Sequence, residues 1–224
     1  HACGRSNQQA VFLSTLGRTY ALEAHTLPSA RSQGEPLTGR FALGAGEEVR
    51  HLVMGNEGEP YLICSDAGYG FVCTYDDLIG KNKNGKALLT VPEGGLVMAP
   101  QKIGSPETDL CMAISNEGRM LLFPLSTLPV LGKGKGNKLI SIPSARVKAR
   151  EEFMVMAAII PQGQYVTLFA GKRKLTLKPS DLDYYRGERG RRGAKLPRGL
   201  QRVDRIEIEP AAGAEPAAGE NQEE

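Results

Sequence analysis

The sequence predicts an all-β array of propeller-like units, and three recurring features support this fold class. A short apolar run leads into a glycine-centred turn four times, with the turn glycines at positions 17, 68, 118 and 171. Leucines in turn or helix-start contexts recur at 27, 78, 128 and 182, and glycines in basic loops recur at 34, 85, 136 and 190. A period of about fifty residues is typical of propeller-like or solenoid arrays, in which each copy forms one structural unit.

Each unit is predicted to contain four strands. The first strand ends at the turn glycine. The second is expected over residues 19–23, 70–75, 119–123 and 173–177. A single helical turn and a basic loop follow, and two further strands close the unit, for example 87–91 and 96–103 in the second copy. In the third copy, residues 151–160 are the best candidate for a helix, but their apolar half is predicted to be a strand, since the run from Phe153 to Ile160 ends at Pro161.

The composition is compatible with a folded β array. The 224 residues are 41% hydrophobic, and many of the 27 glycines and 14 prolines lie between apolar runs, where they supply turn geometry. No apolar run approaches the length of a membrane span, so we expect no membrane insertion. The first residue is His1 and not Met, and we expect the sequence to be a piece of a longer chain.

The cysteines do not form a metal-binding pattern. Cys64, Cys73 and Cys111 lie within apolar strand patterns, Cys3 lies near the N-terminus, and no CxxC pair occurs. A zinc site needs closely spaced pairs of ligands. We therefore predict buried free thiols, which suit a reducing cytoplasm, and no metal or cofactor in this chain.

The predicted β domain covers residues 10–208. Its repeats are expected at residues 10–58, 59–107, 108–161 and 162–208. Residues 1–9 are interpreted as the remnant of a preceding blade. Residues 209–224 are predicted to be a disordered acidic tail, because they are rich in Ala, Gly, Pro and Glu and lack an apolar pattern.

Charge is distributed unevenly along the chain. The formal net charge is +3, but residues 171–205 contain twelve Lys or Arg against four Asp or Glu. The segment from Glu207 to the end contains six Glu and no basic residue, so the preceding body carries 28 basic and 19 acidic residues, a formal charge of +9. A basic body of this kind indicates an anionic partner.

Basic, glycine-rich loops occur at the same phase of each repeat, so a radial array would place them on one edge. They span residues 31–40, 80–86, 132–138 and 186–193. Lysines and arginines at phosphate spacing give salt-dependent, sequence-independent affinity for DNA. We also expect the loop glycines to let the backbone approach a phosphate closely. The predicted DNA-binding residues are Arg31, Arg40, Lys81, Lys83, Lys86, Lys133, Lys135, Lys138, Lys172, Arg173, Lys174, Arg189, Arg191, Arg192 and Lys195.

Other interpretations of these residues are weaker. A single basic loop is often only a solvated surface loop, but four loops in phase argue against that explanation. Residues 80–86 fit the spacing G-x-x-x-x-G-K, yet Ala87 stands where a nucleotide-binding P-loop has Ser or Thr. His1, His25 and His51 lack a repeated acidic partner or a metal-ligand spacing, so no catalytic residue is predicted.

Segments from every repeat carry a family resemblance. Residues 27–39, 65–74, 133–138 and 187–193 resemble, in the same order, segments of the C-terminal domain of the A subunit of bacterial DNA topoisomerase IV, and the resemblance extends from about residue 10 to 208. The related gyrase A domain carries a Gln-, Arg- and Gly-rich box in its first blade. Only residues 186–193 have a similar composition here, and they lie in the last repeat, which favours topoisomerase IV.

The resemblance implies a β-pinwheel, a propeller-like disc whose blades exchange a strand, and this chain is expected to be part of a five-bladed array. It further implies an accessory domain that binds and bends double-stranded DNA. Such a domain helps set the topology preferred in decatenation and supercoil relaxation and is not catalytic alone. ATP, magnesium and the catalytic tyrosine are used elsewhere in the holoenzyme.

The resemblance also implies partners and a location. The partners are double-stranded DNA, the catalytic N-terminal part of the A subunit, the ATPase-bearing B subunit and a chromosome-organising condensin, in the cytoplasm and at the nucleoid. The alternative is a protein-binding β-propeller scaffold with incidental basic loops. Weak, salt-independent binding to DNA would favour this alternative. A third interpretation is an enzyme with a site in the central channel. A cluster of carboxylates or histidines at the centre of the disc would favour this interpretation.

Overall fold

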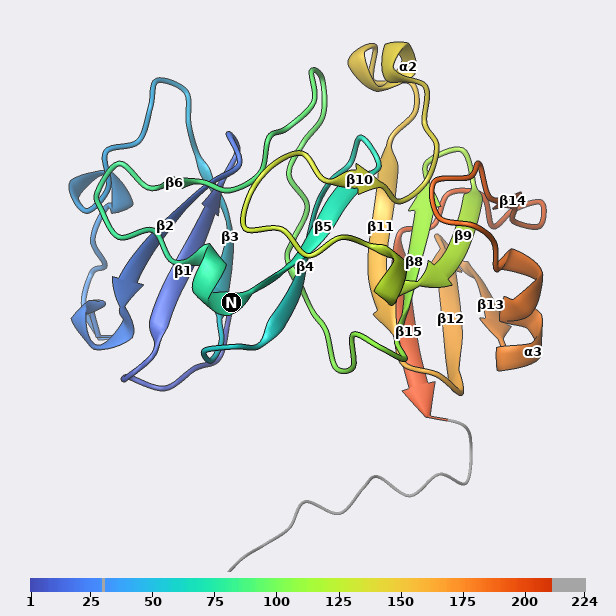
Figure 1. Ribbon diagram of the computed structural model, residues 1–224, viewed down its shortest axis with the longest axis horizontal. Coiled ribbons are helices and arrows are strands. Elements are labelled where there is room, and N and C mark those ends of the chain that lie inside the picture. Colours follow the sequence, from blue (N-terminus) through green and yellow to red (C-terminus); the bar gives the residue numbers. More distant parts are fainter. Residues whose placement is uncertain (30, 211–224) are drawn as a thin grey trace, which may run out of the picture.

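The computed structural model describes residues 1–29 and 31–210, which form antiparallel sheets in chain order (Figure 1). Each sheet is one blade. Blades 1 and 2 contain β1 (Gln9–Ser14), β2 (Arg18–Glu23) and β3 (Val49–Met54), and then β4 (Pro60–Ser65), β5 (Tyr69–Thr74) and β7 (Gln101–Lys102). Blades 3 and 4 contain β8 (Leu110–Ser115), β9 (Arg119–Pro124) and β11 (Met154–Ile160), and then β12 (Gln164–Ala170), β13 (Arg173–Leu177) and β15 (Arg205–Pro210). The predicted all-β, propeller-like fold is confirmed.

Adjacent blades exchange a short strand. The exchanged strands are β6 (Lys86–Ala87), β10 (Asn137–Lys138) and β14 (Ala194–Lys195). In the sequence, each exchanged strand follows the second strand of its own blade. In the structure, it pairs with the second strand of the preceding blade: β6 with β2, β10 with β5 and β14 with β9. The sheet orders are therefore β3-β1-β2-β6, β10-β5-β4-β7 and β11-β8-β9-β14, whereas blade 4 has the order β13-β12-β15. Within the described residues, no later strand pairs with β13.

Short helices follow the second strand of each blade, as predicted. They are η1 (Ala24–Thr26), α1 (Tyr75–Leu78), η3 (Leu125–Thr127) and α3 (Pro179–Leu182), which continues into η4 (Asp183–Tyr185). A capping box starts α1, because the Asp77 carboxylate accepts a hydrogen bond from the Thr74 backbone N–H at 3.1 Å. Two other helices, η2 (Leu37–Gly39) and α2 (Ser144–Lys148), precede β3 and β11. None of the helices in the described part of the chain is long and apolar enough to cross a membrane.

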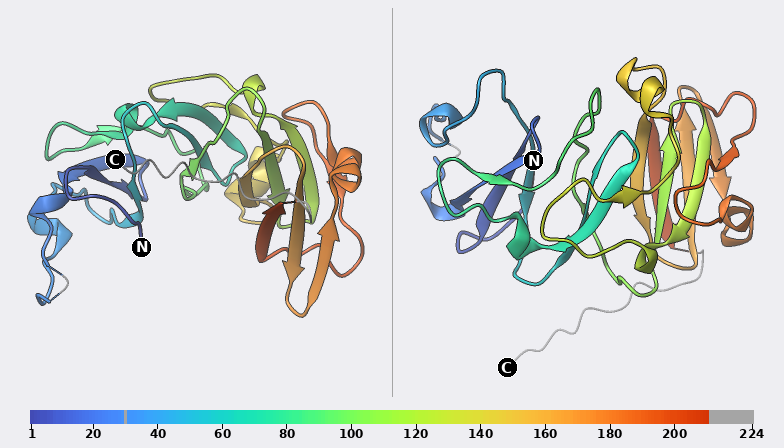
Figure 2. Two further views of the ribbon diagram at one scale, coloured as in Figure 1. Left: turned by 90° about the horizontal axis from the view of Figure 1, so that it is seen from below. Right: turned by 45° about the horizontal axis from the view of Figure 1, so that its top comes forward.

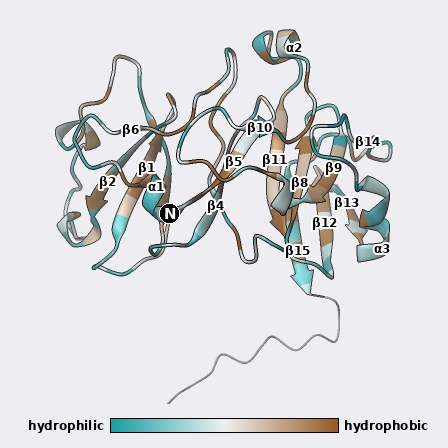
Figure 3. Ribbon diagram, in the orientation of Figure 1, coloured by the Kyte–Doolittle hydropathy of each residue, from teal (hydrophilic) through white to brown (hydrophobic). Residues whose placement is uncertain are grey.

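The hydrophobic core lies between the blades. In β8, Cys111 and Ala113 face blade 2, whereas Met112 and Ile114 face blade 4. Burial of both faces explains why this strand is a continuous apolar run in the sequence and does not alternate. Figure 3 shows hydrophobic residues concentrated in the long strands and hydrophilic residues concentrated in the connecting segments.

The two ends of the row of blades differ. The outer face of blade 1 is apolar and is covered by the segment before β3, where the Phe41 ring lies 5.4 Å from Phe12 and 4.9 Å from Tyr20. The outer face of blade 4 is polar, and its Thr167 and Thr176 hydroxyl groups lie 2.9 Å apart. The outer face of blade 4 thus carries paired hydroxyl groups, whereas that of blade 1 carries aromatic rings.

Two predicted strands of the second repeat are wrong in extent. Of residues 87–91 only Ala87 is in a strand, in β6, and this strand belongs to the sheet of blade 1. Of the strands, residues 96–103 contain only β7, which starts directly after Pro100, because proline has no N–H for a strand ladder. The strand predicted within 151–160 is confirmed as β11. Sequence reasoning did not predict α2.

Three predictions about the organisation of the chain remain open. The repeat boundaries and the interpretation of residues 1–9 stay predictions. The predicted acidic tail lies, from residue 211 onward, outside the described residues.

Candidate nucleic-acid interface

Each basic loop that follows blade 1 ends in an exchanged strand. The end of each loop and the residues directly after it have the pattern Gly-x-x-Leu, at 85–88, 136–139 and 193–196. The leucine N–H donates to the carbonyl of the turn glycine in the preceding blade, and all three leucines are buried. The hydrogen bonds are Leu88 to Gly17 (3.1 Å), Leu139 to Gly68 (2.7 Å) and Leu196 to Gly118 (2.8 Å). One end of each loop is therefore fixed to the neighbouring blade.

The glycine that opens this pattern lies against protein backbone. Gly85 and Gly193 have φ angles of 69° and 77°, in the left-handed region that favours glycine. A Cβ atom at either position would lie 2.7 Å from a backbone oxygen of the preceding blade, that of Thr19 or Met120. Close packing against the preceding blade therefore explains why glycine stands at these two positions, and the approach of loop glycines to a phosphate stays a prediction.

The basic segments contact one another in series. The backbone hydrogen bonds are Ala42 N–H to the Lys83 carbonyl (3.0 Å), Gly134 N–H to the Leu88 carbonyl (2.9 Å) and Gly190 N–H to the Leu139 carbonyl (2.9 Å). We call residues 39–42, 81–90, 130–141 and 186–195 the linked loops. The left view of Figure 2 shows the blades along an open arc, with the linked loops after β5, β9 and β13 on its convex side. These loops thus form one continuous edge.

Lysines provide much of the exposed charge on the linked loops. Lys81, Lys83, Lys133, Lys135, Lys138 and Lys195 are all exposed. In the part of the chain that the structure describes, the lysines held in ion pairs are Lys102 and Lys148, which lie outside the linked loops. Lys135 extends over the Tyr69 ring, with its Nζ 4.5 Å from the ring centre. Lys86 is half-buried and donates to the Asp77 carbonyl.

Two arginines of the predicted site pair with a carboxylate in their own segment. Arg40 lies 2.7 Å from Glu35, and Arg191 lies 2.9 Å from Glu188. The hydrogen bond to Glu35 raises the pKa of the Arg40 guanidinium, and the same bond lowers the pKa of the Glu35 carboxyl. Ion pairs this exposed contribute little stability.

Two other arginines join the last loop to the loop before it. Arg189 donates to the Lys138 carbonyl at 2.8 Å and to the Thr127 carbonyl at 3.0 Å. Arg192 donates to the Ser141 carbonyl at 2.8 Å. Their guanidinium groups are therefore oriented by protein carbonyls, while their charge still contributes to the edge.

A buried carboxylate lies beneath this junction. The Glu152 side chain has no exposed area, and its carboxylate lies 2.5 Å from Arg192 and 3.5 Å from Arg146. Arg192 thus connects the exposed edge to an acidic group in the interior. The arrangement compensates the buried charge, which would otherwise be costly to keep away from water.

Some predicted residues lie apart from the linked loops. Lys172, Arg173 and Lys174 are exposed on the β12–β13 turn and on β13, in the terminal blade. Arg173 donates to the Arg198 carbonyl at 3.5 Å. Arg31 is exposed in the turn before η2. The other predicted residues all lie on the linked loops.

Sequence reasoning missed Arg18 and Arg119. Both follow a turn glycine and donate hydrogen bonds to a basic loop of the next repeat. A usable signal existed, because a basic residue directly follows the turn glycine at positions 18, 119 and 172. That recurrence belongs to the strand pattern and not to the loop pattern, which is why it was not connected to the loops.

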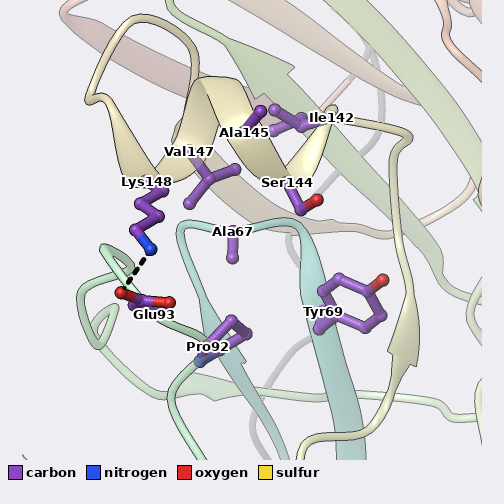
Figure 4. Close-up of a pocket in the computed structure, with 9 residues that line it drawn as sticks. All are labelled: Ala67, Tyr69, Pro92, Glu93, Ile142, Ser144, Ala145, Val147 and Lys148. Carbon is purple, nitrogen blue, oxygen red and sulfur yellow. Dashed lines mark ion pairs between the residues drawn. The ribbon is translucent and has the colours of Figure 1, made fainter.

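A small cavity between blade 2 and α2 offers little for catalysis. It has a volume of about 240 Å³, and Tyr69, Pro92 and Val147 are among its lining residues (Figure 4). Its one acidic lining residue, Glu93, pairs with Lys148 at 2.7 Å. Across the described residues, no group of three or more His, Cys, Asp or Glu side chains could hold a metal ion.

The cysteines are free, and Cys64, Cys73 and Cys111 are buried, as predicted. Burial raises the pKa of the Cys64 and Cys73 thiols to about 12. A thiol with so high a pKa carries almost no thiolate at neutral pH and is a poor nucleophile. These cysteines therefore contribute to packing.

A row of blades that exchange strands, with a basic edge on the exchanging loops, defines a β-pinwheel domain. The sequence matches the family described as "DNA gyrase C-terminal domain, beta-propeller" over residues 60–103 and 109–154. More particularly, the chain belongs to the family of C-terminal domains of the DNA topoisomerase IV A subunit. It is 53% identical over 208 residues to the A subunit of DNA topoisomerase 4 from Pseudomonas aeruginosa, and 50% identical over 206 residues to that from Escherichia coli K12.

Solved structures agree with this assignment. The E. coli ParC C-terminal domain matches with a TM-score of 0.87 at 50% identity, and the match covers 92% of this chain and 83% of that chain. A DNA gyrase A C-terminal domain matches with a TM-score of 0.63 at 13% identity, over 90% of this chain and 66% of that chain, which shows a shared fold alone. The sequence matches cover 93% and 92% of this chain but only 28% and 27% of the P. aeruginosa and E. coli proteins.

Proposed function

We propose that this chain is the accessory DNA-binding and DNA-bending domain of an ATP-dependent type II DNA topoisomerase, and that it is not catalytic alone. The observation that carries the proposal is the continuous edge of exposed lysines and arginines on the linked loops. Family membership supports it, because the similar proteins are topoisomerase subunits. The domain would capture a DNA segment and help set the topology preferred in decatenation and supercoil relaxation.

The proposed partners follow from family membership. They are double-stranded DNA, the catalytic N-terminal part of the A subunit, the ATPase-bearing B subunit and a chromosome-organising condensin, with the complex in the cytoplasm at the nucleoid. ATP and magnesium would be used by other parts of the holoenzyme. The chain spans 28% of the length of its P. aeruginosa relative, so these activities require the remainder of such a protein.

The proposed binding is electrostatic and does not read base sequence. Exposed lysines on successive loops can each neutralise a phosphate and release its condensed counterion. The middle loop carries Lys133, Lys135 and Lys138 at alternate or near-alternate positions. Arg191 can exchange its contact with Glu188 for a phosphate, because both side chains are 73% exposed.

Replacing Lys133, Lys135 and Lys138 together by Ala should weaken binding to unrelated DNA duplexes by similar factors. The slope of log K against log salt concentration should fall by about one for each phosphate that the variant no longer neutralises. Fluorescence anisotropy with two duplexes of different sequence, over a series of salt concentrations, measures both quantities.

The matched control removes the same charge from elsewhere. Arg50, Lys102 and Lys148 each pair with a glutamate outside the linked loops, and their triple Ala variant should keep most of the salt slope. Equal slopes for the wild type and the loop variant would contradict phosphate contacts by the loop lysines. Weak, salt-independent binding by the wild type would favour the protein-binding propeller.

The domain should also bend the DNA that it binds. The linked loops follow the convex side of an arc, whereas bending a duplex of 20–30 base pairs costs about 1–6 kcal/mol. Contacts on successive loops can offset this cost only if the duplex follows the arc. Energy transfer between dyes at the two ends of a duplex should therefore increase on binding. Unchanged transfer at saturation would show that the bound DNA stays straight.

A further inference from the structure

The residue after each turn glycine lies beside the loop that arrives from the next repeat. Arg18 follows Gly17 and pairs with Ala87 of β6, and Arg119 follows Gly118 and pairs with Lys195 of β14. Both arginines are half-buried. They stand at the point where an exposed basic loop becomes an exchanged strand.

Both arginines donate hydrogen bonds to backbone carbonyls of the incoming loop. Arg18 donates from Nε to the Asn84 carbonyl at 3.1 Å and from Nη2 to the Gly85 carbonyl at 3.2 Å. Arg119 donates from Nη1 to the Gly193 carbonyl at 3.1 Å. In each case the acceptor includes the glycine that opens the Gly-x-x-Leu pattern. A guanidinium has donors fixed in one plane and can hold two carbonyls at once, which a lysine cannot do in the same geometry.

The other two blades show what varies at this position. In blade 2 the residue is Tyr69, and Lys135 of the incoming loop lies over its ring. In blade 4 the residue is Lys172, which is exposed. Within the described residues no exchanged strand pairs with β13, and a Cβ at Gly171 would meet nothing within 4 Å. The residue after the turn glycine is thus half-buried in blades 1 to 3, where an exchanged strand arrives, and exposed in blade 4, where none does in the described part of the chain.

We propose that Arg18 and Arg119 are positioning residues, which fix the basic loops of the next repeats so that the loop lysines face a DNA phosphate. The inference rests on the proposed DNA-binding function and assigns these arginines a role different from that of the lysines. Their guanidinium groups are directed at backbone carbonyls of the loops, so they order the loops and do not themselves replace counterions on DNA.

The separate role has a measurable signature. A phosphate ligand changes both the affinity and the salt slope, whereas a positioning residue changes the affinity at a constant slope, because the number of phosphate contacts stays the same. Arg18→Lys keeps the charge but cannot hold both carbonyls. We expect this variant to bind duplex DNA about threefold to tenfold more weakly with the wild-type slope, as for the loss of one ordinary hydrogen bond.

A second measurement needs no DNA. Hydrogen exchange followed by mass spectrometry should show faster exchange in residues 80–88 of Arg18→Lys, with unchanged exchange in the strands of blade 4. Arg119→Lys should show the same effect in residues 186–196. Arg50→Lys is the control, because Arg50 lies on β3 of the same sheet as Arg18 and pairs with Glu48 at 3.1 Å.

The outcomes separate the two proposals. If wild-type protein binds DNA without salt dependence, the proposed function fails, while the exchange experiment still decides whether the arginines order the loops. The positioning role is overturned if Lys81→Ala has a smaller salt slope than the wild type while Arg18→Lys matches the wild type in DNA affinity and in hydrogen exchange of the loop. A slope reduced by about one in Arg18→Gln, with wild-type exchange in the loop, would make Arg18 a phosphate ligand instead.

Discussion

Replacement of Glu152 by Ala should lower the free energy of unfolding by about 3 kcal/mol. Removing one partner of a buried ion pair costs roughly 3–5 kcal/mol, because the other charge is left without compensation. The carboxylate has no exposed area and lies between Arg192 and Arg146. Those arginines keep 38% and 41% of their side-chain area exposed, so water can partly solvate them, which places the effect at the lower end of that range.

Urea denaturation followed by circular dichroism measures this change. The control is Glu151→Ala at the neighbouring position, whose side chain is 62% exposed and whose truncation should change stability by less than about 0.5 kcal/mol. In the Glu152→Gln and Arg192→Gln double variant, the two changes should cost less than the sum of the single ones, since the contact is shared. Additive effects would show that the two side chains do not interact in solution.

Replacement of Leu139 by Ala should destabilise the domain by about 2–5 kcal/mol. Leu139 belongs to the Gly-x-x-Leu pattern, is fully buried between blades 2 and 3, and follows β10 directly. Truncation leaves a cavity at the point where one repeat is attached to the preceding one. The effect should therefore include faster hydrogen exchange in β5 and β10, beyond the decrease in global stability.

The control for this variant is Leu96→Ala. Leu96 is 56% exposed, so its truncation should cost less than about 0.5 kcal/mol. Thermal or urea denaturation of both variants gives the comparison. Similar stability of Leu139→Ala and Leu96→Ala would mean that the exchanged strand does not contribute to the attachment of the blades.

The sequence predicted the long strands because their signal is local. The run from Leu110 to Ser115 is apolar and ends at a glycine turn, and both properties can be read from neighbouring residues. The exchanged strands are only two residues long and pair with residues about sixty positions or more away, as Lys86 does with Thr19. Nothing local marks them as strands, and only the family resemblance implied them. The helix α2 was missed because it begins after Pro143 without a side-chain cap.

The candidate site was predicted as a set of charges but not as a set of contacts. Phase in the repeat identified Lys81, Lys133 and Arg189 as members of one surface. It could not show that Arg189 and Arg192 are held by carbonyls of the preceding loop, or that Arg192 reaches buried Glu152. Those contacts depend on how adjacent blades pack, and a pattern within one repeat carries no information about its neighbour.

The exchange of strands has a mechanical consequence for the domain, whatever pulls on its basic loops. Each basic loop from 81 to 195 emerges from one blade and is paired to the blade before it. A pull on such a loop is thus divided between two sheets, and the covalent chain between repeats carries only part of the tension. A force on one loop is therefore shared with the adjacent blades before any single blade opens.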